Sequence, residues 1–253
     1  MADHRSPHGE ADGTAPFGFE RVDLASKQER VDQVFDTVSD RYDLMNDLMS
    51  MGLHREWKNV FAAQVKPARN RASRHIDVAG GTGDVARRIR AAGGPQTQIV
   101  VADINESMLR AGRANGNTLP AVTANAEALA FADRAFDTYT IAFGIRNVPR
   151  IDRALREAWR VLDWGGRFLC LEFSQVTIPV LDRLYDAYSF KVLPAIGARI
   201  TGAAQPYRYL AESIRTFPGA DEFEAQIRDA GFARTSHQLL SGGIVAIHSG
   251  WKL

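Results

Sequence analysis

The sequence predicts an α/β fold in which a doubly wound, mostly parallel sheet of seven strands carries helices on both faces. Three observations predict it. Short apolar runs alternate with helical patterns through the middle of the chain, as in parallel sheets with crossover helices. The first apolar run ends in a glycine-rich turn, Gly80-Gly-Thr-Gly83. Finally, two strand patterns near 235–240 and 243–248 flank a Ser-Gly pair, which predicts a hairpin at the end of the chain.

The individual elements follow in chain order. Apolar residues recur at helical spacing between Gln28 and Val65, which predicts two or three N-terminal helices. The strands of the sheet are then expected at 74–79, 98–103, 121–124, 136–143 and 166–173. Helices are expected at 85–92, around 108–109, at 151–162 and at 223–230.

Two segments stand outside this alternation. Residues 176–200 are aromatic and apolar, and we expect them to form a helical insertion or lid over the sheet edge that extends to about residue 216. Residues 1–27 are rich in Ala, Gly, Asp, His and Pro and show no periodicity, so we expect a disordered tail there. The domain itself is therefore predicted to span 28–253.

The composition, with 45% hydrophobic and 24% charged residues, is that of an ordinary globular domain. A formal net charge of +1 gives no overall attraction to nucleic acid, so no nucleic-acid partner is expected. The chain has neither an apolar run of the roughly 20 residues that span a bilayer nor the apolar segment of a secretory signal. These features predict a cytoplasmic protein. The single cysteine, Cys170, lies among apolar residues and is expected in the core.

A ligand site is predicted at the carboxyl edge of the sheet. Gly81 and Gly83 let the backbone turn sharply and approach a ligand closely. Asp103 follows at the end of the second strand, where a carboxylate can accept both ribose hydroxyl groups of an adenosine. However, Gly81-Thr-Gly-Asp-Val-Ala86 also satisfies the dinucleotide pattern G-x-G-x-x-A. On these residues alone, an S-adenosylmethionine-dependent methyltransferase and a nicotinamide dehydrogenase fit equally well.

Three further features favour the methyltransferase. Asp77 lies inside the first strand, where its carboxylate can bind the amino group of an amino-acid moiety and would repel a pyrophosphate. The loop Asn125-Ala126-Glu127 follows the third strand and can hydrogen-bond an adenine edge. The order of Phe136-Asp-Thr-Tyr139, Arg160-Val-Leu-Asp-Trp-Gly-Gly166 and a closing hairpin is the layout of class I, Rossmann-like methyltransferases. S-adenosyl-L-methionine is therefore the expected cofactor, and no metal site is predicted.

Seven strings of the sequence carry a resemblance to one family. They are Val34-Phe-Asp-Thr-Val-Ser-Asp-Arg-Tyr-Asp-Leu-Met-Asn46, Asp77-Val-Ala-Gly-Gly-Thr-Gly-Asp84, Ala102-Asp-Ile-Asn-Glu-Ser-Met108, Asn125-Ala-Glu-Ala-Leu129, Phe143-Gly-Ile-Arg-Asn147, Leu171-Glu-Phe-Ser174 and Tyr207-Arg-Tyr-Leu-Ala-Glu-Ser-Ile214. With them, the chain resembles the ubiquinone/menaquinone biosynthesis C-methyltransferases from about Val34 to Lys252. The glycine turn is common to many methyltransferases, whereas the first, fifth and last strings are much more selective.

The resemblance implies transfer of a methyl group to a ring carbon of a polyprenylated benzoquinol (2-methoxy-6-polyprenyl-1,4-benzoquinol type), of demethylmenaquinol, or of both. By motif position, it implies that Thr82, Asp103 and the pair Asn125-Ala126 bind the cofactor. Ala142 stands where the family usually has a serine that contacts the cofactor, so that contact is not expected in this chain.

Three residues are the candidates for catalysis. The guanidinium of Arg146 stays protonated and would stabilise an acceptor phenolate electrostatically. Asn147 would orient a water or the second ring oxygen, and Tyr42 would hydrogen-bond the quinol. Glu172 is a weaker candidate for the proton acceptor. The alternatives are a loop salt bridge and turn for Arg146 and Asn147, and a core position for Tyr42.

The partners follow from the apolar prenyl tail of the acceptor. We expect residues 176–200 to line a groove for this tail or to rest on the inner face of the membrane as a peripheral contact. Ordinary core or a homodimer surface would explain the same residues. Other quinone-pathway enzymes are candidate partners. Two other functions stay open: a non-catalytic scaffold for those enzymes, and a methyltransferase with a different acceptor.

Overall fold

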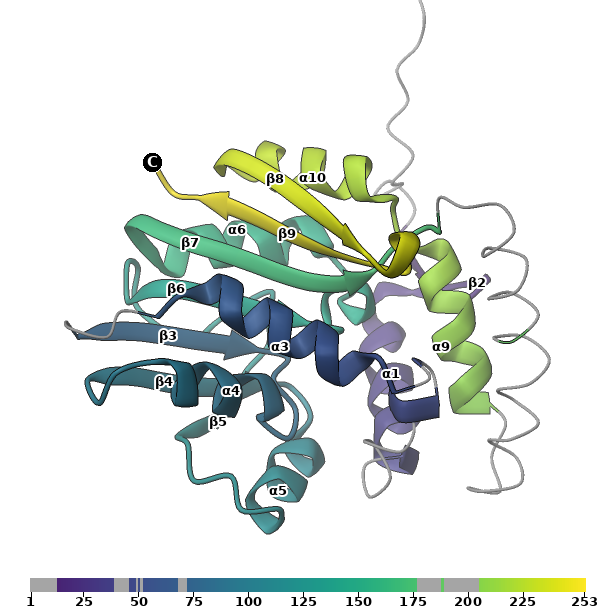
Figure 1. The fold of residues 1–253 in the computed structure, drawn as a ribbon. Coiled ribbons are helices and arrows are strands. Elements are labelled where there is room, and N and C mark those ends of the chain that lie inside the picture. The colour runs from purple at the N-terminus through teal and green to yellow at the C-terminus, as the bar shows by residue number, and fades with distance from the viewer. Residues whose placement is uncertain are drawn as a thin grey trace, which may run out of the picture.

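A seven-stranded sheet forms the centre of the molecule (Figure 1). The computed structural model describes residues 13–38, 46–48, 50, 52–67, 72–176, 188 and 205–253. The sheet order is β5-β4-β3-β6-β7-β9-β8. Its strands are β3 (Ser73–Val78), β4 (Thr97–Asp103), β5 (Ala121–Thr123), β6 (Phe136–Ala142), β7 (Leu162–Phe173), β8 (Ala233–Leu240) and β9 (Val245–Trp251). Strands β5, β4, β3, β6 and β7 run parallel to one another, whereas β9 is antiparallel to both β7 and β8. This arrangement confirms the predicted fold class and closing hairpin.

Helices cover both faces of the sheet. They are α1 (Leu24–Val38), α3 (His54–Val65), α4 (Asp84–Ala92), α5 (Glu106–Ala114), α6 (Ile151–Val161), α9 (Gln205–Thr216) and α10 (Ala220–Asp229), with the short 3-10 turns η3 (Ile145–Asn147) and η5 (Ser241–Gly243). Side chains alternate between the two faces of the sheet along a strand. Leu169 and Leu171 therefore pack in the core that includes α3 and α4, whereas Phe168 and Cys170 pack in the core on the other face, which includes α6 and α10. Cys170 is fully buried, as expected.

Helices α1 and α9 lie side by side beyond the carboxyl ends of the parallel strands (Figure 1). Helix α9 belongs to the predicted insertion, and its buried residues include Tyr207, Tyr209 and Leu210. Residues 177–187 and 189–204, expected to form the tail groove or a membrane contact, lie outside the described residues. Of the helices that the structure does describe, none is both long enough and apolar enough to cross a bilayer.

The N-terminal region differs from the prediction. Residues 13–27 were expected within a disordered tail, but β1 (Thr14–Phe17) and β2 (Glu20–Asp23) form an antiparallel hairpin that leads directly into α1. Ala15 and Val22 are buried, and the ring of Phe17 stacks on Tyr209 with centroids 4.3 Å apart. The prediction is wrong for this stretch because the hairpin is stabilised by contacts with the distant helix α9. The local sequence shows no periodicity that would reveal these contacts. Residues 1–12 lie outside the described part of the chain.

Candidate functional site

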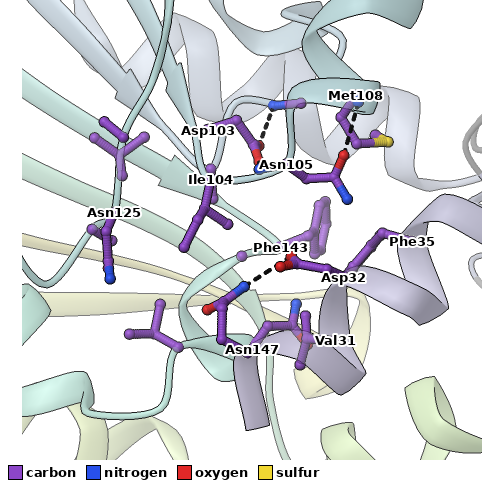
Figure 2. Close-up of a pocket in the computed structure, with 18 residues that line it drawn as sticks. Val31, Asp32, Phe35, Asp103, Ile104, Asn105, Met108, Asn125, Phe143 and Asn147 are labelled. Carbon is purple, nitrogen blue, oxygen red and sulfur yellow. Dashed lines mark hydrogen bonds between the residues drawn. The ribbon is translucent and has the colours of Figure 1, made fainter. Parts of the chain in front are cut away.

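The predicted site corresponds to a cavity at the carboxyl edge of the sheet, closed on one side by α1 (Figure 2). Five of the ten residues predicted for the site line it: Gly81, Asp103, Asn125, Ala126 and Asn147. They come from the turn after β3, the end of β4, the loop after β5 and the turn η3 after β6. Parallel strands end at one edge of the sheet, which is why segments so far apart in sequence converge there.

The glycine turn and Asp103 are joined directly. Gly81 has a φ of 53°, a left-handed conformation that glycine adopts without strain. Its N–H donates to Oδ2 of Asp103 at 2.8 Å, and the N–H of Asn105 donates to Oδ1 at 2.8 Å. A carboxylate has about four acceptor sites on its two oxygens. These two hydrogen bonds therefore orient Asp103 and leave lone pairs for hydroxyl groups of a ligand.

Burial changes the acidity of Asp103. The pKa of its carboxyl group is raised to about 6, mainly by loss of solvent, and the nearby carboxylate of Asp32 contributes in the same direction. The N–H groups of Asn105 and Gly81 oppose this shift because they stabilise the charged form. Asp103 therefore changes protonation state just below neutral pH.

The loop after β5 is held by an internal hydrogen bond and by an ion pair with the start of α6. Oδ1 of Asn125 accepts a hydrogen bond from the N–H of Glu127 at 2.8 Å. The Glu127 carboxylate accepts hydrogen bonds from Nε of Arg150 at 2.6 Å and from the Arg150 backbone N–H at 3.0 Å. Asn125 and Ala126 are thus held in the cavity wall by the charge-assisted hydrogen bonds between Glu127 and Arg150 at the start of α6.

Three residues predicted to bind the cofactor do not line this cavity. Asp77 is buried in β3, where its Oδ1 accepts a hydrogen bond from the hydroxyl of Thr140 at 2.6 Å, and burial raises its pKa to about 7. The backbone of Thr82 packs so closely on Gly112 that a Cβ there would lie 2.7 Å from the Thr82 carbonyl oxygen. Gly83 caps α4 and lies against Asn117. Ligand contacts of Asp77, Thr82 and Gly83 remain predictions.

Helix α1 supplies the wall opposite the glycine turn. Gln28, Val31, Asp32 and Phe35 recur at the spacing of one helix face and line the cavity together. Nε2 of Gln28 donates to Oδ1 of Asp32 at 2.9 Å. Sequence reasoning missed this wall, because the four residues read only as part of an amphipathic helix. The mixture of polar and apolar residues on that helix face was the one feature of the sequence that could have indicated a cavity wall.

Of the two catalytic candidates that the structure describes, Asn147 lines the cavity. The hydroxyl of Tyr209 donates to Oδ1 of Asn147 at 3.0 Å, so the amide is fixed in one orientation. The ring of Tyr209 is itself held by its stacking on Phe17 of the N-terminal hairpin. Sequence reasoning missed Tyr209, since nothing local connects α9 to η3.

Arg146 forms a buried ion pair. Its Nη1 donates to Oε1 of Glu172 at 2.6 Å and to the carbonyl oxygen of Phe143 at 2.8 Å, and its side chain is 4% exposed. Burial raises the pKa of Glu172, while the Arg146 charge opposes that shift. Arg146 does not line this cavity, and its ion pair joins the turn η3 to strand β7. The geometry therefore matches the alternative in which Arg146 forms a salt bridge. Tyr42 lies outside the described residues.

Comparisons with known proteins identify relatives over almost the whole chain. A sequence model described as the ubiE/COQ5 methyltransferase family matches residues 23–252. A protein of Methylobacterium nodulans named ubiquinone/menaquinone biosynthesis C-methyltransferase UbiE is 58% identical over 242 residues, which cover 94% of this chain and 96% of the relative. A protein of the same name from Bradyrhizobium diazoefficiens is 58% identical over 247 residues, or 95% and 98% of the two chains.

Solved structures share the fold at low sequence identity. A methyltransferase of Thermotoga maritima, described as S-adenosylmethionine-dependent, superposes with a TM-score of 0.61 at 18% identity over 87% of this chain and 99% of its own. The putative methyltransferase bound to the Trm112 activator of Haloferax volcanii gives a TM-score of 0.62 at 16% identity over 88% and 97%. These two similarities concern the fold alone.

Proposed function

The chain belongs to the ubiE/COQ5 methyltransferase family, and from this membership we propose that it methylates a ring carbon of a polyprenylated quinol in ubiquinone/menaquinone biosynthesis. The methyl donor is S-adenosyl-L-methionine. The acceptor is a 2-methoxy-6-polyprenyl-1,4-benzoquinol, demethylmenaquinol or both. This acceptor class is supported by the match to relatives named ubiquinone/menaquinone biosynthesis C-methyltransferase. They are 55–58% identical to this chain over more than nine tenths of its length.

The charge of the cavity supports this donor. Among the described residues that line it, Asp32 and Asp103 are the only ionisable side chains, and both are acidic. S-adenosylmethionine carries a positive sulfur and an ammonium group, which carboxylates attract, whereas a dinucleotide pyrophosphate would be repelled. The cavity therefore favours a methyltransferase over the dehydrogenase that also fits the glycine turn.

Each wall of the cavity has a proposed task. S-adenosylmethionine supplies an electrophilic methyl group. Asp103 accepts hydrogen bonds from the ribose hydroxyl groups, and Asn125 donates to the adenine edge. An acceptor hydroxyl with a pKa of about 10 costs roughly 4 kcal/mol to ionise at pH 7. The NH2 group of Asn147 can offset part of this cost by donating to the phenolate oxygen.

The acceptor carbon would provide the electron pair of the new carbon–carbon bond, while the methyl–sulfur bond of the donor breaks and leaves its electron pair on a neutral sulfur. The ring hydrogen would then leave as a proton. We assign Arg146 a positioning task in this step. Because its guanidinium is bound to Glu172 and Phe143, it fixes the turn that carries Asn147. A direct contact between Arg146 and the phenolate would require the ion pair with Glu172 to open.

Quinone profiling tests the function. Mass spectrometry of a strain from which the gene is deleted should show a demethylated precursor, and the accumulating species names the acceptor. Purified protein should also transfer an isotopically labelled methyl group to short-chain reduced quinols. A normal quinone profile together with no labelled product from either acceptor would refute the proposal. Calorimetry with the donor separates an enzyme from a scaffold, since a scaffold without a donor site releases no binding heat.

Tyr209→Phe should lower turnover by about twofold to tenfold, with binding of the donor unchanged. The substitution removes the hydroxyl that orients Asn147, and one net hydrogen bond contributes about 0.5–1.5 kcal/mol. Single-turnover kinetics with a saturating donor measure the effect. Tyr139→Phe is the matched control, because the Tyr139 hydroxyl is buried without a hydrogen-bond partner among the described residues. Equal losses in the two variants would mean that Tyr209 has no specific task.

Donor binding should weaken as the pH falls from about 7 to 5. Burial holds the pKa of Asp103 at about 6 in the free protein. The protonated group loses both its charge and acceptor capacity, so the Kd should rise by up to about tenfold per unit below that pKa. Calorimetry across this range measures the effect, and Asp103→Asn should flatten the profile. A wild-type Kd that is constant from pH 5 to 7 would contradict the role of Asp103.

We also propose a peripheral membrane contact, because the prenyl tail of the acceptor partitions into lipid. Liposome flotation should recover part of the protein with the vesicles when they contain a long-chain quinol. Complete recovery in the aqueous fraction, both with and without the quinol, would argue against the contact.

A further inference from the structure

The wall formed by α1 places a second carboxylate in the donor cavity. Asp32 faces the cavity from α1, whereas Asp103 lies on the opposite side at the end of β4 (Figure 2). The two groups are close enough that the charge of Asp32 acts on Asp103. Two carboxylates that face one small space repel each other unless a cation lies between or beside them.

No described basic side chain compensates for Asp32. Its Oδ1 accepts a hydrogen bond from the neutral amide of Gln28, and no ion pair joins Asp32 to a Lys or Arg of the described residues. The charged group that acts on Asp32 is Asp36, another carboxylate, which accepts a hydrogen bond from Nδ2 of Asn105 at 3.0 Å. A carboxylate in this setting is compensated best by a cationic ligand.

The neighbours of Asp32 reinforce this preference. Phe35, one turn further along α1, and Phe143, after β6, line the same cavity. Aromatic faces attract cations through their quadrupole. The cavity thus combines two carboxylates and two aromatic rings with no described basic group, a set of groups suited to a positive charge.

We propose that Asp32 recognises the positive charge of S-adenosylmethionine and so makes the site distinguish this donor from neutral-sulfur S-adenosylhomocysteine. This inference rests on the proposed function. The two molecules share the adenosine and amino-acid groups, and they differ in the methyl group and the charge on sulfur. The attraction to Asp32 therefore exists before methyl transfer and is lost afterwards, which favours replacement of the product by fresh donor.

Calorimetry with both molecules tests the proposal on the full chain. Asp32→Asn keeps the shape of the side chain and removes only its charge. We expect the Kd for S-adenosylmethionine to rise by about fivefold to twentyfold, while the Kd for S-adenosylhomocysteine changes by less than about twofold. Asp32→Glu, which restores the charge, should recover part of the preference for the donor.

Glu29→Gln is the matched control, because Glu29 is an exposed acid on the same helix. It should leave both Kd values unchanged. Equal weakening of both ligands by Asp32→Asn, or no weakening of either, would overturn the role of Asp32 while leaving the methyltransferase assignment intact. A wild-type protein that binds neither molecule would overturn the proposed function itself.

Discussion

Arg146→Ala is expected to lower the free energy of unfolding by about 3–5 kcal/mol, because it leaves the carboxylate of Glu172 buried without its partner. The Glu172 side chain is fully buried and the Arg146 side chain is 4% exposed, so water cannot replace the lost interaction. Urea unfolding followed by circular dichroism measures the change. A loss below about 1 kcal/mol would mean that the pair is not maintained in solution.

The double variant Arg146→Met, Glu172→Leu separates the effect of Arg146 on stability from its effect on turnover, because it leaves no unpaired charge in the core. Replacing both members of a buried pair by apolar residues is often nearly neutral for stability, so the double variant should recover most of the loss. If Arg146 positions Asn147 as proposed, turnover should remain low in this stable variant while donor binding is retained. Normal turnover in a folded double variant would remove Arg146 from the mechanism.

Asp103→Asn is expected to weaken donor binding by at least about a hundredfold. The carboxylate is proposed to accept both ribose hydroxyl groups, and hydrogen bonds to a charged group contribute about 1.5–3 kcal/mol each, where 1.4 kcal/mol is tenfold in affinity. The amide has one oxygen to share between the N–H of Gly81, the N–H of Asn105 and the ligand. Calorimetry at neutral pH measures the effect.

The control for Asp103 is Asp133→Asn. The Asp133 side chain is 72% exposed and pairs with Arg160 on the surface, so its loss should leave the Kd unchanged. Binding by Asp103→Asn within about threefold of the wild-type value would show that this carboxylate does not hold the donor. The assignment of the cavity as the donor site would then fail as well.

Much of the architecture could be predicted because its signals are local. Strands β3, β4 and β6 have six or seven residues each and match the predicted apolar runs, and the longer β7 contains the run predicted at 166–173. The turn at Gly81 and the position of Asp103 also depend on local geometry, namely a left-handed backbone and the end of a strand. Parallel strand order then brings both to one edge of the sheet.

Other features depended on contacts between distant segments. The hairpin β1–β2 has strands of four residues each, too short for a periodic signal, and it is stabilised by packing on α9, almost two hundred residues away. Arg146 lies in the turn η3, and its partner Glu172 lies in strand β7. The sequence suggested a catalytic role for Arg146 from its place after β6, but the structure shows that it forms an ion pair.

The sequence alone determined the fold class, the family and the place of the cavity proposed for the donor, because periodicity, glycine geometry and motif spacing act over a few neighbouring residues. Tertiary structure alone decided which side chains face that site. Asp32 lines the cavity, whereas Arg146 does not line it and pairs with Glu172. The hydroxyl of Tyr209, on α9, donates a hydrogen bond to Asn147. Such orientations arise when whole elements pack together, since burial and pairing of each charge depend on partners that the chain brings near only on folding.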